Sequence, residues 1–175
     1  QVEKYKAEIY EDKDDIIKGN PEGSIVIVEF LDTNCFYCGE AHPVIKKILS
    51  ENPEIKLIEK QLPFLKGSFE GSIAVLAAKR QGLNSELLNH FFKEKGSSSS
   101  LNSIIEAAGS IPGLDVEQLK KDMKDQDIIN HVNRNKNVAR EVGISGTPAF
   151  ILKDDIINGY LPYDEFLKRI NNSSK

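Results

Sequence analysis

In the first third of the chain, the pattern of apolar residues changes from that of a strand to that of a helix. Residues 24–31 (Ser-Ile-Val-Ile-Val-Glu-Phe-Leu) form a nearly continuous, β-branched apolar run, which is typical of a strand buried on both faces. Asp32, Thr33 and Asn34 interrupt this run with side chains that favour turns and helix caps. From Cys35 onward the apolar residues recur at helical spacing. The pattern therefore predicts a helix that begins directly after a buried strand.

Further elements of a mixed sheet are predicted on both sides of the chain's middle. Residues 55–62 form an imperfectly alternating strand pattern that ends at Pro63, and a strand-helix-strand order predicts a parallel pair joined by a crossover. Near the other end, residues 149–152 and 156–158 flank a short polar turn and indicate a hairpin. A final helix follows, with Pro162 near its start.

The long middle stretch is predicted to be helical. Apolar residues at helical spacing, with glycines and capping residues at the ends, predict helices at 69–81, 84–95, 101–108, 115–124 and 127–142. The first twenty residues are rich in charge and carry only a brief helical stripe of Val2, Tyr5 and Ile9. This stripe is shorter than a coiled coil requires, so we expect a monomer.

Composition narrows the class of protein. Leu, Ile, Val and Phe together are far more frequent than in disordered chains, so a folded core is expected. The net charge is −4 and basic residues form no long run, which argues against a nucleic-acid partner. The longest apolar stretch of the first third, residues 25–28, is far shorter than the ~18 residues of a membrane helix. The chain begins at Gln1 without a signal core, so we expect that a targeting segment was removed or the chain was shortened.

The chain contains two cysteines, Cys35 and Cys38, which are separated by two residues. A disulfide that closes so short a loop adds only ~2 kcal/mol to the free energy of unfolding in the chain-entropy model, so the pair would contribute little as a structural disulfide. Two thiols on the first turn of a helix can instead form and break a bond with little backbone movement. At a helix start, free N–H groups and the helix dipole stabilise a thiolate. We therefore expect Cys35 to be the reactive thiol and Cys38 the resolving thiol.

Several motifs together resemble the thioredoxin superfamily, and more narrowly the DsbA-like thiol-disulfide oxidoreductases of bacterial envelopes. In chain order, the matching segments are Val28-Glu29-Phe30, Cys35-Phe36-Tyr37-Cys38, Pro43, and Gly146-Thr147-Pro148-Ala149-Phe150. The resemblance implies an α/β fold, namely a thioredoxin fold with a helical insertion between its two halves. We expect an N-terminal extension at 1–20, a core formed by 21–68 and 143–175, and an insertion at 69–142.

The resemblance also implies roles for individual residues. Glu29 corresponds to an acidic residue that lies behind the cysteines and assists proton transfer to the buried thiol. The alternative is that the strand end is wet and Glu29 is merely exposed. Thr147 and Pro148 correspond to a cis-proline loop that faces the sulfurs and pairs with an extended substrate chain. Phe36 and Tyr37, between the cysteines, are expected to contact substrate and to help set the redox potential.

The function expected from these motifs is thiol-disulfide exchange, most simply disulfide formation in unfolded or partly folded cysteine-containing proteins. A disulfide isomerase or reductase, or a chaperone-like binding module with little redox turnover, remains an alternative. A membrane protein that reoxidises the pair is a further candidate partner, and the expected location is the periplasm or another extracytoplasmic space. The resemblance implies no metal and no organic cofactor.

Two other uses of the cysteines are weighed against redox chemistry. A zinc site would include His42, four residues after Cys38, but a fourth ligand at suitable spacing is missing from the sequence. A Cys-His hydrolase would need His90 or His131 to approach Cys35. A pair of cysteines two residues apart makes neither use necessary.

Overall fold

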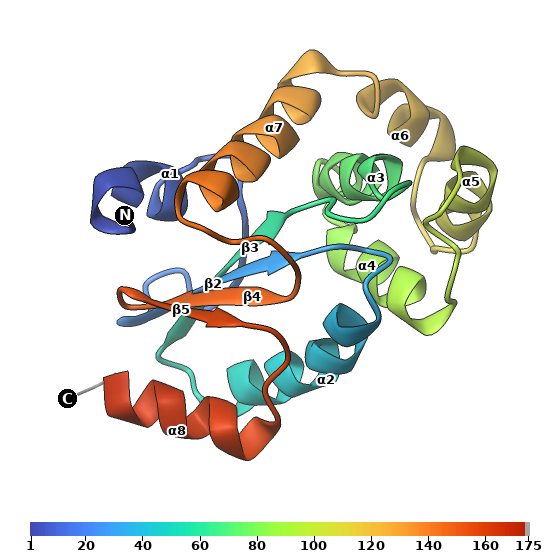
Figure 1. Cartoon of the computed structure of the whole chain (residues 1–175). Helices are drawn as coiled ribbons and strands as arrows, with labels where there is room; N and C mark the ends of the chain where they lie inside the picture. The colour runs from blue at the N-terminus through green and yellow to red at the C-terminus, as the bar shows by residue number, and fades with distance from the viewer. Residues whose placement is uncertain (174–175) are drawn as a thin grey trace.

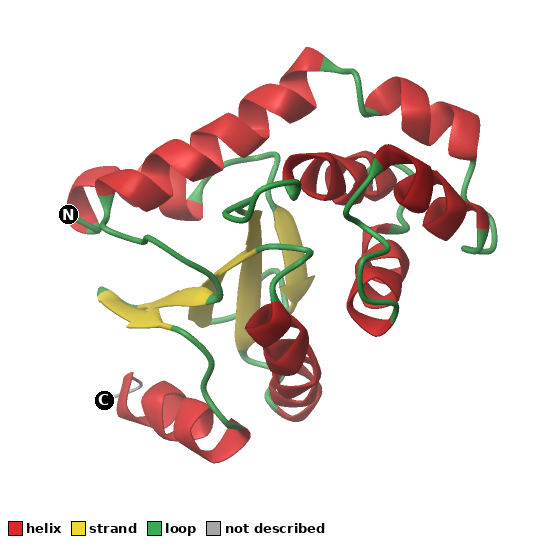
Figure 2. Ribbon diagram, turned by 45° about the vertical axis from the view of Figure 1, so that its right-hand side comes forward, coloured by secondary structure: helices red, strands yellow, loops and turns green. Residues whose placement is uncertain are grey.

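A five-stranded mixed sheet with helices on both faces forms the centre of the protein (Figures 1 and 2). The computed structural model describes residues 1–173. The strands, in chain order, are β1 (Ile16–Gly19), β2 (Ile25–Leu31), β3 (Ile55–Gln61), β4 (Ala149–Leu152) and β5 (Asp155–Asn158). Their spatial order is β1-β3-β2-β4-β5. β2 and β3 are parallel, and each of the other neighbouring pairs is antiparallel. The α/β fold predicted from the sequence is confirmed.

The unit β2-α2-β3 carries the two cysteines. Helix α2 (Phe36–Glu51) begins directly after the loop that follows β2, as the apolar pattern predicts. It continues through Pro43, although the proline ring removes one backbone hydrogen bond of the helix. The predicted parallel pairing of the two strands is also confirmed, with Ile25 opposite Ile55 at one end.

The two faces of the sheet are covered by different helices. Along β2, Ile27 packs with residues of α2 and of α8 (Tyr163–Ser173), whereas Val28 and Phe30 pack on the opposite side. That opposite side is covered by α1 (Lys6–Tyr10), which follows a short 3-10 turn at Glu3–Tyr5, and by the end of α7 (Gln126–Glu141). Figure 1 shows α2 and α8 below the sheet and α1 and α7 above it. Since side chains alternate along a strand, the face of each β2 residue is fixed by its position.

The remaining helices pack around a second apolar core beside the sheet. They are α3 (Phe69–Lys79), α4 (Asn84–Lys93), α5 (Leu101–Gly109) and α6 (Val116–Asp122), each within a few residues of its predicted range. Every residue from Gly71 to Ala78 is buried, which explains the lack of a polar face on α3. Helix α7 contacts both this core and the core on the sheet. Its residues Ile128 and Val132 pack among these helices, whereas Val138 and Ala139 pack on the sheet.

One strand, β1, was not predicted from the sequence. It lies within residues 1–20, which were expected to precede the fold, and pairs antiparallel with β3 at the edge of the sheet. A strand of four residues that includes Lys18 and Gly19 has too little alternation to be recognised by pattern. The same segment contributes Val2 and Ile9, both buried, to the core under α7, so the brief helical stripe packs against the protein itself.

A buried ion pair holds the N-terminal segment to β3. Lys60 has no exposed side-chain area, and its Nζ lies 2.5 Å from Asp15 Oδ2 and 2.9 Å from the carbonyl oxygen of Glu8. The other oxygen of Asp15 lies 2.9 Å from His131 Nε2 on α7. A charge in the interior needs such partners, because its lost hydration is not otherwise replaced.

Asp15→Asn should therefore destabilise the fold by about 3–5 kcal/mol, since it leaves the Lys60 ammonium buried without a counter-charge. The double variant Asp15→Asn/Lys60→Met should recover much of the loss, because it removes both charges. Urea unfolding followed by circular dichroism measures both. Lys13→Met is the control, because Lys13 pairs with Asp14 at the surface, and its urea midpoint should be unchanged. Equal midpoints for the Asp15 and Lys13 variants would contradict the assigned role of the buried pair.

Candidate functional site

The two cysteines lie one turn apart where α2 begins. Cys35 is the N-cap residue, and its sulfur accepts a hydrogen bond from the backbone N–H of Cys38 at 3.2 Å. The side chain of Cys35 is half-buried, whereas Cys38 has no exposed surface. Both thiols are free. The sequence-predicted pair is therefore arranged as one accessible sulfur and one covered sulfur.

The same arrangement moves the two thiol pKa values in opposite directions. The pKa of Cys35 is lowered to about 6, chiefly by the hydrogen bond from the Cys38 side chain, and further by the contact with Thr147 and the hydrogen bond from the Cys38 backbone N–H. The pKa of Cys38 is strongly raised, first because the thiol is buried and then because it hydrogen-bonds to Cys35. Near neutral pH the first sulfur is a thiolate and the second keeps its proton.

The loop before β4 brings the second predicted motif to the cysteines. The Thr147–Pro148 peptide bond is cis, and the carbonyl oxygen of Thr147 lies 3.4 Å from Cys35 Sγ. Pro148 is buried, and the next residue, Ala149, pairs with Phe30 of β2. The antiparallel β2-β4 pairing thus holds this loop against a site more than a hundred residues away in the sequence.

Glu29 lies on the face of the sheet that α2 covers. It shares this face of β2 with Ile27 and Leu31, and Leu31 packs in the same apolar core as Cys38 on α2. Glu29 is only 3% exposed, so the alternative of a wet strand end is wrong. Its pKa is raised to about 8, first by burial and then by the charge of Glu59, while Lys18 lowers it. Near neutral pH this carboxyl group holds a proton.

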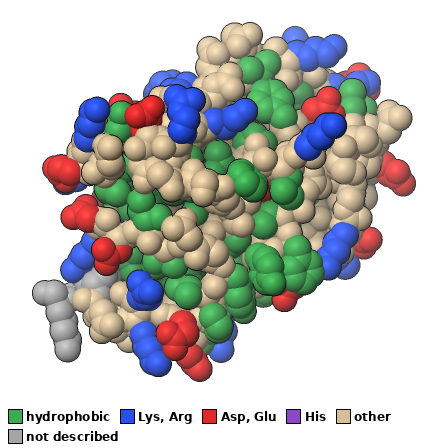
Figure 3. Space-filling model, viewed as in Figure 1, with side chains coloured by type: hydrophobic (Ala, Val, Ile, Leu, Met, Phe, Trp, Pro, Cys, Tyr) green, Lys and Arg blue, Asp and Glu red, His purple; other side chains and the backbone are tan. Residues whose placement is uncertain are grey.

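Large apolar side chains are exposed around the start of α2 (Figure 3). Phe36 and Tyr37 are 55% and 58% exposed, and their rings meet edge to face at 5.2 Å. The ammonium of Lys95 lies 4.5 Å from the centre of the Phe36 ring. Phe64 and Leu65, in the loop after β3, are also exposed. These aromatic and aliphatic groups form an exposed apolar surface beside Cys35, of the kind that marks interaction sites.

Asp32, which the sequence pattern indicates only as a turn former, organises the site. Its buried carboxylate accepts hydrogen bonds of 2.8 Å from the backbone N–H groups of Asn34 and Leu65. It thereby joins the loop before Cys35 to the loop after β3. Asn34 in turn contacts Ser68 and Ser98 through its side-chain amide. An aspartate placed directly after a buried strand was the only sequence signal for this role.

The histidines are held away from the sulfurs. His42 Nε2 lies 2.5 Å from Asn89 Oδ1, and its ring packs against Phe92, so it joins α2 to α4. His90 contacts Ser110, and His131 contacts Asp15. None of these contacts includes a cysteine, as a zinc site or a Cys-His pair would require.

Within residues 1–173, the one group of side chains close enough to share a metal ion is Asp12, Asp15 and His131. Lys60 and Arg134 already form ion pairs with those two carboxylates. The Lys60 and Arg134 side chains therefore occupy the positions beside these carboxylates that a metal ion would need.

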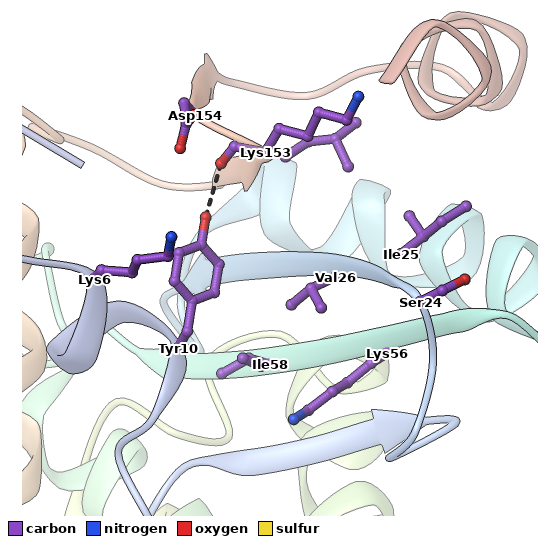
Figure 4. A pocket seen from close by; sticks show the side chains of 10 residues that line it. Lys6, Tyr10, Ser24, Ile25, Val26, Lys56, Ile58, Lys153 and Asp154 are labelled. Carbon is purple, nitrogen blue, oxygen red and sulfur yellow. Dashed lines mark hydrogen bonds between the residues drawn. The ribbon is translucent and has the colours of Figure 1, made fainter. Parts of the chain in front are cut away.

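A cavity of about 810 Å³ lies on the other face of the sheet, away from the cysteines (Figure 4). Val26 and Ile58 form its apolar floor, and Tyr10, whose hydroxyl donates to the Lys153 carbonyl at 2.7 Å, closes one side. None of the site residues lines it. Across residues 1–173, every helix is too short or too polar to span a membrane.

Known proteins share this architecture. Residues 11–172 match the thioredoxin family. A thioredoxin-like oxidoreductase from Silicibacter pomeroyi DSS-3 aligns with a TM-score of 0.90 at 27% identity, over 96% of each chain. The thiol-disulfide exchange protein alpha-DsbA2 of Wolbachia pipientis aligns with a TM-score of 0.88 at 25% identity, over 98% of this chain and 92% of that one.

A relative of similar sequence is also named as an oxidoreductase. A Rickettsia bellii (strain RML369-C) protein named as a protein-disulfide oxidoreductase is 25% identical over 162 residues, which are 87% of this chain. The match spans 62% of that relative's length. Because the family match extends over nearly the whole chain, and the solved structures align with its sheet and its helices alike, this chain belongs to the thioredoxin family.

Proposed function

We propose that this chain is a protein thiol-disulfide oxidoreductase that exchanges disulfides with cysteine-containing proteins through Cys35 and Cys38. The observation that carries the proposal is the contrast between the two sulfurs, because one is accessible with a lowered pKa and the other is buried with a raised pKa. Exchange requires such a pair, since one sulfur must react with substrate and the other must close the disulfide internally. The likeness to solved thiol-disulfide exchange proteins supports it.

In the oxidising direction, a substrate thiolate attacks Cys35 Sγ of the oxidised pair. A substrate–Cys35 disulfide forms, the Cys35–Cys38 bond breaks, and Cys38 leaves as a thiolate that takes up a proton. A second substrate thiolate then attacks the substrate sulfur, so the substrate disulfide forms and Cys35 leaves as a thiolate. The substrate loses two electrons, which the cysteine pair gains.

Glu29 is proposed to exchange the proton with Cys38. A thiolate at a buried sulfur is costly, so Cys38 must be protonated when it leaves and deprotonated when it attacks. Glu29 lies under α2 on the same face of the sheet, and a pKa of about 8 lets it act in both directions near neutral pH. No other ionisable side chain of β2 is available on that face.

Substrate binding is proposed at the rim of the site. The cis Thr147–Pro148 loop beside Cys35 supports pairing with an extended chain, and Phe36 and Tyr37 offer apolar contact. The substrates are then unfolded or partly folded proteins with cysteines, and a membrane protein that reoxidises the pair is a further proposed partner. Disulfides persist outside the cytoplasm, so we place the protein in the periplasm or a comparable compartment.

The direction proposed is disulfide formation. A stabilised Cys35 thiolate favours the reduced form of the pair, and a pair that favours reduction is a strong oxidant of its substrates. Reductase action would run the same exchange in the opposite direction, and isomerase action would start from the reduced pair without net oxidation of the substrate. A chaperone-like module would use only the apolar rim.

Alkylation of the reduced protein should select Cys35 with a pH midpoint near 6, because only its thiolate is populated and accessible. Cys38 should stay unmodified up to high pH. The rate of modification by iodoacetamide, with the site identified by mass spectrometry, measures both. Cys38→Ala should move the midpoint upward, since it removes the main hydrogen bond to the thiolate. Faster modification of Cys38, or a Cys35 midpoint like that of a free thiol, would contradict the proposed roles.

Glu29→Gln should slow oxidation of a reduced two-cysteine peptide at pH 7 by about tenfold or more, because Cys38 then leaves without a proton donor. Peptide oxidation by the oxidised protein, followed by stopped-flow fluorescence, measures the rate. Glu54→Gln, an exposed carboxylate next to β3, is the control and should keep the rate of the unsubstituted chain. Equal rates for Glu29→Gln and the control would remove Glu29 from the mechanism.

The unsubstituted protein should be a monomer that oxidises a reduced unfolded protein faster than it rearranges scrambled disulfides. Light scattering gives the mass, and refolding of a disulfide-containing test protein gives both rates. Cys35→Ala and Cys38→Ala should each abolish turnover. A stable dimer or trimer that mainly repairs scrambled disulfides would favour an isomerase, and full activity without both cysteines would favour a chaperone-like module.

A further inference from the structure

A second buried carboxylate lies directly beside Glu29. Glu59 on β3 is opposite Glu29 on β2 in the parallel register, and it is only 1% exposed. Ile27 and Leu57, two residues earlier on the two strands, pack into the same core as α2. Because side chains two residues apart share a face, both carboxylates point towards α2.

Lys18 on the edge strand β1 supplies a single positive charge to this pair. It lies opposite Leu57 in the antiparallel register, so it shares the face of Glu59, and it forms an ion pair with that carboxylate. The Lys18 side chain is 18% exposed and the Glu59 side chain 1%. Glu59 also accepts a hydrogen bond of 3.0 Å from Gln61 Nε2. The lysine and the amide thus both contact the Glu59 carboxyl group.

The other elements around the cluster add no second counter-charge. From α2, His42 faces it, and burial lowers the pKa of that imidazole, which keeps it neutral near pH 7. From β4, the residue opposite Glu29 is the apolar Phe150. Two carboxyl groups therefore share one ammonium group in a region with little water, and the unfavourable state is the one in which both are ionised.

We propose that Lys18 and Glu59 are positioning residues that set the protonation state of Glu29, and through it the rate of proton exchange with Cys38. The inference rests on the proposed role of Glu29. It follows that the two residues act in opposite directions. The Glu59 carboxylate keeps the proton on Glu29, and the Lys18 ammonium favours its release, in accord with their effects on the Glu29 pKa.

The step that reports on this cluster is the closure of the disulfide in the reduced protein. With an excess of dithiobis-nitrobenzoate, the Cys35 thiolate attacks the reagent and releases one thionitrobenzoate. Cys38 then passes its proton to the Glu29 carboxylate and attacks Cys35 Sγ. The Cys35–Cys38 bond forms, the bond from Cys35 to the second thionitrobenzoate breaks, and that group leaves as a thiolate. The second release is unimolecular, and its rate rises with pH as Glu29 ionises.

We expect Lys18→Met to move the pH midpoint of the second release upward by about one unit or more, because the ionised carboxylates lose their counter-charge. Glu59→Gln should move the midpoint downward by a similar amount, because Lys18 then faces Glu29 alone. Lys56→Met removes a positive charge from β3 on the opposite face, beside Ile58, and should leave the midpoint unchanged. Stopped-flow absorbance over a range of pH measures all three.

In a Glu29→Gln background, neither Lys18→Met nor Glu59→Gln should move the remaining pH dependence. If the two residues have a purely structural role, both variants should have a lower urea midpoint. Their pH midpoints would then either stay unchanged or move in the same direction, and either result would overturn the inference. If the pH midpoint depends on Glu29 but is the same in the Lys18 and Glu59 variants as in the unsubstituted protein, the inference is wrong and the proposed function stands. Absence of the second release in the unsubstituted protein would reject the proposed function itself.

Discussion

The burial of Cys38 beneath a half-exposed Cys35 is the constraint on which the rest of the site depends. It arises because α2 begins immediately after a strand that is buried on both faces, so the first turn of the helix lies over the end of the sheet. The first sulfur is then at the N-cap, where it accepts a backbone N–H, and the second is one turn inside the core. One helix start thus creates two chemically different thiols from the same residue type.

The burial that raises the pKa of Cys38 is the reason why the proposed mechanism includes a proton carrier. A covered thiol exchanges protons slowly with water, so the proposed carrier is a buried group on the neighbouring strands. The carboxyl group of Glu29 is buried on the same face, and Glu59 and Lys18 lie next to it on the adjoining strands. In a region with few water molecules each charge strongly affects its neighbours, so even the edge strand β1 contributes to the electrostatics under α2.

The helices beside the sheet shape the surroundings of the reactive sulfur. The end of α4 places Phe92 against His42, and the residues just after α4 place Lys95 over Phe36. Asp32 joins the loop before Cys35 to the loop that exposes Phe64 and Leu65. The apolar rim around Cys35 is therefore assembled from α2, the loop after β3 and the helical region. A chain with only the sheet and α2 would keep Phe36 and Tyr37 but would lack the contact of Lys95 with the Phe36 ring.

The sequence by itself determined the local elements and the candidate redox pair. A β-branched run followed by cap formers and helical spacing is a local signal, and it located β2, Cys35 and α2 correctly. The Thr147–Pro148 motif was recognisable by resemblance, and the register of β4 against β2 then brought it to Cys35. Only the tertiary structure decided which charges share a face. The pairing of Glu59 with Glu29, the entry of Lys18 through an unpredicted edge strand, and the role of Asp32 depend on strand register and long-range packing, which a local pattern of apolar residues does not encode.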